Sequence, residues 1–67
     1  MKKYELSLKK KILEIIDFKL KQGVSNYDIA VYLDDIIYNT SENCSNGYYT
    51  FLVDLQDKYI KLYENNK

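Results

Sequence analysis

Residues 25–39 read Ser-Asn-Tyr-Asp-Ile-Ala-Val-Tyr-Leu-Asp-Asp-Ile-Ile-Tyr-Asn, and the interpretation of the whole chain depends on them. Ser25 and Asp28 have the spacing of a capping box, with an acid in place of the usual Glu or Gln. The hydroxyl of Ser25 can accept a hydrogen bond from the amide of residue 28, and a helix dipole favours an acid in the first turn. The sequence therefore predicts a helix over residues 25–39.

This predicted helix has one apolar face and one mixed face. Ile29, Leu33, Ile36 and Ile37 fall on one side, which we expect to be buried. The opposite side combines aromatic, aliphatic and acidic side chains at a 4-3-4 spacing, with a second aspartate beside it: Tyr27, Val31, Asp34, Tyr38 and Asp35. Tyrosines at helical spacing often cover neighbouring helices. The other interpretation, which stays open beside the first, is that these five residues bind a partner, and they are our predicted site.

The 67 residues suffice for one small domain. Cys44 is the only cysteine, so no disulfide within the chain can form, and a reduced, cytoplasmic setting is expected. No apolar run approaches the roughly 20 residues that span a bilayer. The lysines at positions 2 and 3 are not followed by the apolar block of a signal peptide. The sequence predicts neither secretion nor contact with a membrane.

The formal net charge is zero, but the charges are unevenly distributed. Residues 1–22 hold seven lysines and three acids, and residues 58–67 hold three lysines and one acid. Residues 23–57 hold six acids and no basic residue. This pattern favours a protein partner with a basic surface, or self-association against the basic N-terminal segment, over nucleic acid.

Residues 4–22 and 48–63 also show the spacing of amphipathic helices. Gly23 supplies a left-handed stop after the first of them, and residues 39–47 form a polar loop rich in turn formers. We therefore predict an all-α fold, a small three-helix bundle with helices at about 4–22, 25–39 and 48–63. Its predicted core consists of Ile12, Ile16, Leu20, Ile29, Leu33, Ile36, Ile37, Leu52, Leu55 and Leu62.

The apolar content exceeds what three short helices can easily bury. Leu6, Leu8, Phe18 and the eight tyrosines would have to be covered in addition to the predicted core. Large exposed apolar patches normally mark interfaces. We therefore predict that a homodimer completes the bundle, and the sequence leaves open which helix forms the contact.

The residue types argue against catalysis and metal binding. The chain has no histidine and no glycine-rich loop, and Asp34 and Asp35 are adjacent on a helix, so they point about 100° apart. The acids show no loop spacing that resembles a calcium site. Cys44 has no histidine or lysine nearby to lower its pKa, so we interpret it as an incidental thiol. The sequence predicts no enzyme, no cofactor and no metal.

Residues 23–30 read Gly-Val-Ser-Asn-Tyr-Asp-Ile-Ala, and Leu33 follows three residues on. This run resembles the first helix of a helix-turn-helix unit, a family that commonly has Ser-x-x-(Glu/Asp)-Ile-Ala-x-x-Leu there. Ile29, Ala30 and Leu33 match its packing positions, and the match covers about nine of the 67 residues. The family's tight turn should follow Leu33, but here the helical pattern continues through Tyr38.

The helix-turn-helix resemblance implies a DNA-binding regulator. The chain contains no arginine, which is the commonest base-reading residue. Phosphate contacts, which dominate the affinity of such proteins, would fall to lysines alone. Those lysines are Lys9, Lys10, Lys11, Lys58 and Lys61.

A composition rich in Lys, Ile, Asn and Tyr and free of Arg is typical of AT-rich genomes. It suggests a low-GC bacterium, its phage or its mobile elements, whose small helical proteins often bind and modulate larger proteins. We predict a non-enzymatic protein–protein interaction module, an inhibitor or modulator that binds a basic surface through its acidic, tyrosine-rich face. A helix-turn-helix-like regulator is the alternative.

Overall fold

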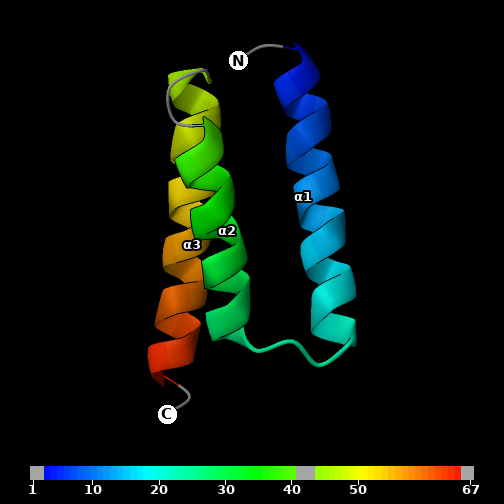
Figure 1. Cartoon of the computed structure of the whole chain (residues 1–67), viewed down its shortest axis with the longest axis vertical. Coiled ribbons are helices and arrows are strands. Elements are labelled where there is room, and N and C mark those ends of the chain that lie inside the picture. Colours follow the sequence, from blue (N-terminus) through cyan, green and yellow to red (C-terminus); the bar gives the residue numbers. More distant parts are fainter. Residues whose placement is uncertain (1–2, 41–43, 66–67) are drawn as a thin grey trace.

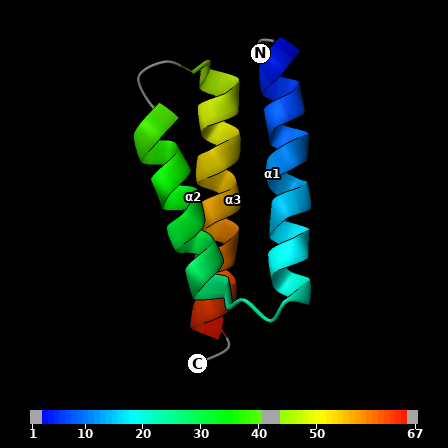
Figure 2. The same ribbon diagram turned by 45° about the vertical axis from the view of Figure 1, so that its right-hand side comes forward.

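The computed structural model describes residues 3–40 and 44–65 of the chain. These residues form three helices, α1 (Lys3–Lys21), α2 (Asn26–Thr40) and α3 (Asn46–Asn65), and no strand (Figure 1). The fold is a small all-α three-helix bundle, as predicted. Figures 1 and 2 show the three helices side by side.

The turn between α1 and α2 follows the predicted signals closely. Gly23 has a φ of 88°, the left-handed conformation that glycine adopts without strain. The amide of Gly23 donates to the carbonyl of Leu20 (3.1 Å) and that of Val24 donates to Lys19 (3.0 Å), which is the Schellman pattern that ends a helix. Ser25 Oγ then accepts from the amide of Asp28 (3.1 Å) and caps α2.

The connection between α2 and α3 is shorter than the predicted loop of residues 39–47. Asn39 and Thr40 belong to α2, and the Thr40 hydroxyl donates to the Ile36 carbonyl (2.8 Å). The third helix begins at Asn46, two residues earlier than predicted, because Ser45 caps it. Ser45 Oγ accepts from the amide of Tyr48 (3.3 Å). Residues 41–43 lie outside the described residues.

Half of the ten predicted core residues are confirmed as buried: Ile12, Ile16, Ile29, Leu33 and Leu52. Ile36, Ile37 and Leu55 are half-buried and pack against these residues. Leu20 and Leu62 were predicted wrongly, because both are exposed. Each lies in the last turn of its helix, beyond which the helix offers no further turn to cover it. Buried hydrophobic residues that the prediction omitted are Ala30, Tyr48 and Tyr59.

The three helices do not pack equally. The backbones of α2 and α3 approach each other closely along their length, whereas α1 makes few close backbone approaches to either. Both views of the ribbon show α1 standing apart from this pair. Six large apolar side chains of α1 remain exposed: Tyr4, Leu6, Leu8, Leu13, Phe18 and Leu20. The homodimer that would cover such residues stays a prediction.

Candidate functional site

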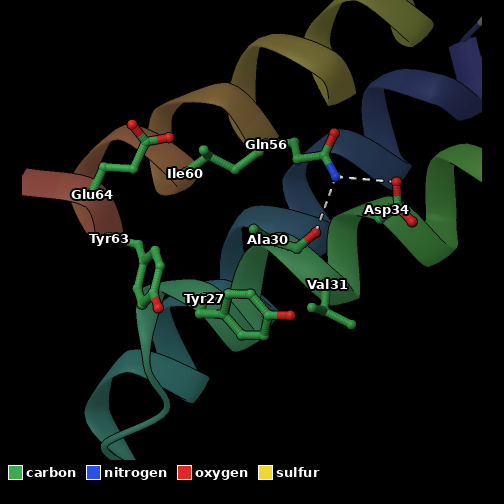
Figure 3. Close-up of a pocket in the computed structure, with 8 residues that line it drawn as sticks. All are labelled: Tyr27, Ala30, Val31, Asp34, Gln56, Ile60, Tyr63 and Glu64. Atoms are coloured by element: carbon green, nitrogen blue, oxygen red, sulfur yellow. Dashed lines mark hydrogen bonds between the residues drawn. The ribbon is translucent and has the colours of Figure 1, made fainter. Parts of the chain in front are cut away.

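A groove of about 400 Å³ lies between α2 and α3. It is lined by eight residues from these two helices and by none from α1: Tyr27, Ala30, Val31, Asp34, Gln56, Ile60, Tyr63 and Glu64. Viewed from the groove, α1 lies behind the α2/α3 pair (Figure 3). The pair is therefore covered by α1 on one side and open on the other.

Two tyrosines form one end of the groove. The rings of Tyr27 and Tyr63 lie with their centroids 5.3 Å apart and their planes tilted by 52°. Tilted aromatic pairs at this distance attract each other through their quadrupoles. About half of each side chain is accessible, 54% of Tyr27 and 41% of Tyr63. The pair thus offers aromatic surface to a ligand while fixing the ends of the two helices against each other.

The middle of the groove is aliphatic, and its other end is polar. Ala30, Val31 and Ile60 lie between the tyrosines and Gln56 (Figure 3). Gln56 Nε2 donates to the Ala30 carbonyl (3.2 Å) and to Asp34 Oδ1 (3.3 Å). Because the amide bridges the two helices, it holds the Asp34 carboxylate at the edge of the groove.

The groove has an acidic rim. Asp34 stands at the Gln56 end and Glu64 at the Tyr63 end (Figure 3). None of the described residues that line it is basic. Lys61 lies on the same helix but forms an ion pair with Asp57 (2.9 Å), whose hydrogen bond and charge raise the pKa of the lysine. The lining therefore presents negative potential with no internal cation to neutralise it.

The structure divides the five predicted site residues into two groups. Tyr27, Val31 and Asp34 line the groove, and Val31 is half exposed. Asp35 and Tyr38 are exposed on α2 outside it, with 83% of Tyr38 accessible. The residues from α3 were not predicted as site residues. Ile60 and Tyr63 belong to the amphipathic pattern of residues 48–63, but the spacing of residues within one helix does not show which neighbouring helix they face.

A second, smaller hollow of about 150 Å³ lies between α1, the end of α2 and the start of α3. The carboxylate of Glu5 is completely buried there and accepts hydrogen bonds from Ser45 N (2.9 Å) and Ser45 Oγ (2.7 Å). A carboxylate beside a helix N-terminus is favoured by the helix dipole. Glu5 thus joins α1 to the cap of α3, a structural role that sequence spacing did not reveal.

Cys44 lines this second hollow together with Tyr48. The thiol is half-buried and packs against the core. Burial raises the pKa of the Tyr48 hydroxyl, and the negative potential of Cys44 and Glu5 adds to the effect. Burial likewise raises the pKa of Tyr32.

The described residues contain no group of three or more acidic, histidine or cysteine side chains that could hold a metal ion. Over the same residues, no helix is both long and apolar enough to cross a membrane. Comparison of the chain with protein-family models, curated proteins and solved structures gives no match. The function must therefore be inferred from the geometry of the chain itself.

Proposed function

We propose that this protein is a non-enzymatic binding module that modulates a larger protein by binding a basic part of its surface. The observation that carries the proposal is the α2/α3 groove, where exposed tyrosine and aliphatic side chains lie between two carboxylates with no basic residue in the lining. Surfaces that combine aromatic area with charge of one sign are typical of protein recognition.

The different side chains of this surface have separate tasks. Tyr27, Tyr63 and Tyr38 supply contact area, because tyrosine loses little conformational entropy when it is immobilised. Asp34 and Asp35 attract a basic partner and orient it as it approaches. Affinity should therefore fall as salt rises, because salt screens exposed charges.

Affinity capture from a lysate of the source organism tests this proposal, with and without nuclease. The informative variant combines Tyr27→Ala with Tyr38→Ala. Its matched control is Phe18→Ala, which removes a ring from α1 that is 62% exposed. We expect one protein partner that is lost with the two tyrosines, retained by the control, and unaffected by nuclease.

The helix-turn-helix alternative predicts a different result in the same experiment. Nucleic acid would be recovered, and it would be lost on changing the lysines at 9–11, or Lys58 and Lys61, to glutamine while the tyrosine variant bound normally. Such an outcome would overturn the proposal. The structure bears on one part of this alternative, since α2 continues without a break past Leu33 to Thr40, where the family has its tight turn.

A further inference from the structure

The groove is elongated, and a carboxylate lies near each of its two ends. Gln56 binds Asp34 at one end, so this acid lies level with position 56 of α3, and Glu64 lies eight residues further along the same helix. With a rise of 1.5 Å per residue, the two levels are about 12 Å apart along the helix axis. Between them the surface is formed by Val31, Ala30 and Ile60 (Figure 3).

We infer that the groove binds an amphipathic helix that carries two basic residues seven positions apart with an apolar residue between them. This inference rests on the proposed function and names what the groove recognises. Residues seven positions apart lie on one face of a helix, roughly 10 Å from each other. This spacing is close to that of the two carboxylates, and the length of a lysine or arginine side chain covers the difference. A leucine-sized side chain three or four positions after the first basic residue falls on the aliphatic middle.

The packing of the helices supports a helical occupant. The α2/α3 pair has two sides; α1 covers one of them, and the groove opens on the other. A helix laid along the groove would pack against α2 and α3 as a fourth helix, with its apolar residue between theirs.

Charge favours a basic helix over an apolar one. Asp34 keeps its second carboxylate oxygen for a partner, because Gln56 is hydrogen-bonded to Oδ1. The tyrosine rings add a second attraction, since a cation within about 6 Å of a tyrosine face is stabilised by the ring quadrupole. The long stems of lysine and arginine also pack well on Ile60 and Val31 while their charged ends reach the rim.

Three synthetic helical peptides of equal length, the first two also of equal composition, test the inference with the whole protein. The first places lysines at positions i and i+7 with leucine at i+3. The second moves the second lysine to i+5, on another face. The third replaces both lysines with glutamine. Nuclear magnetic resonance titration measures affinity and identifies the amides that shift.

We expect the first peptide to bind at least tenfold more tightly than the other two and to shift amides around Tyr27, Asp34 and Ile60. The double variant Asp34→Asn/Glu64→Gln should lose this preference. Its matched control is Glu14→Gln/Asp54→Asn, which removes the same charge from exposed positions outside the groove.

Equal affinity for the first two peptides, or equal loss in the control variant, would overturn the inference, as would the absence of binding by any peptide. A partner captured through Tyr27 and Tyr38 would then still support the proposed function. If the peptide with the correct spacing binds but capture does not depend on those tyrosines, the proposed function fails instead. A second copy of this chain in place of a foreign helix would appear as concentration-dependent shifts at the groove without peptide, and it would also overturn the inference.

Discussion

The α2/α3 pair and α1 have similar amphipathic sequences, yet they are held in the bundle by different interactions. Ile29, Leu33 and Leu52 of the pair are completely buried, and the small side chain of Ala30 belongs to the same core cluster. Close backbone approach needs small residues and interlocking aliphatic side chains, and the pair has both.

The attachment of α1 relies more on polar and mixed contacts. Its buried apolar side chains are Ile12 and Ile16. Around them, the ammonium of Lys9 lies 4.7 Å from the ring centroid of Phe51, and that of Lys19 lies 4.8 Å from the ring centroid of Tyr32. Such long side chains keep helices further apart than alanine or leucine would. We therefore expect the α2/α3 pair to form the stable unit and α1 to be the element that detaches most easily.

The largest expected effect comes from the centre of the pair. Leu33→Ala should cost about 2–5 kcal/mol, because it removes a completely buried side chain and leaves a cavity. Total stability for a domain of this size is on the order of 3–10 kcal/mol, so the variant should unfold at much lower urea. Circular dichroism during urea unfolding measures this.

The matched control makes the same chemical change on the other element. Leu13→Ala truncates a leucine of α1 that is 46% exposed, so it should cost under about 1 kcal/mol in the monomer. Equal losses for the two variants would contradict the difference between the pair and α1.

The next largest effect concerns the polar attachment of α1. Glu5→Ala should cost about 1–3 kcal/mol, because it leaves the Ser45 amide and hydroxyl without the buried carboxylate. Hydrogen exchange should accelerate in α1 and the first turn of α3 and remain slow around Leu52. Glu14→Ala, at an exposed position of α1, is the control. Uniform acceleration through all three helices would show that α1 does not detach separately.

The difference between these two regions also explains what the sequence could predict. Signals within one helix were sufficient where local geometry decides the structure, as for Gly23 in the turn and Ser25 at the cap. Fully buried positions such as Leu33 also followed from periodicity. Contacts across helices could not be predicted in this way: Glu5 and Ser45 are 40 residues apart in sequence. The same holds for the bridge from Gln56 to Asp34, which defines one end of the groove.

The exposed side of α1 leads to a prediction about assembly. Leu6, Leu13 and Leu20 recur every seven residues and are 41–55% exposed, so they form an apolar stripe along α1. Such a stripe is typical of a helix that pairs with another helix. We expect the protein to sediment as a dimer at micromolar concentration, at twice its monomer mass of 8.0 kDa. Leu13→Lys should give the monomer.

Two results would show whether the dimer forms through the leucine stripe of α1 or through the groove. Val31→Lys, which places a cation in the groove, should leave the dimer intact, because Val31 and the leucine stripe belong to different helices. Sedimentation at 8.0 kDa throughout the micromolar range would show instead that α1 stays uncovered in solution.

The smallest expected effect appears only at alkaline pH, at the junction of α1 and α3. Burial raises the pKa of Tyr48 above its ordinary value of 10.0, whereas the unfolded chain keeps that value. Above pH 10 the unfolded state therefore loses the proton more readily than the folded state, and stability falls as pH rises. Tyr48→Phe removes this titration and should flatten the decline. Burial also raises the pKa of Tyr32, so part of the slope should remain in the Tyr48→Phe variant.

Urea unfolding at several pH values between 9 and 11 measures the slope, with Tyr38→Phe as the control because its ring is 83% exposed. If Tyr48→Phe and Tyr38→Phe reduced the slope equally, the pH dependence would not originate at the junction of α1 and α3. If Tyr48→Phe flattens the slope and Tyr38→Phe does not, the slope originates at the junction, and Glu5→Ala should flatten it as well. Loss of Glu5 should lower the pKa of Tyr48 in two ways: it removes a negative charge beside the hydroxyl, and it opens the hollow that Glu5 lines with Tyr48 to water.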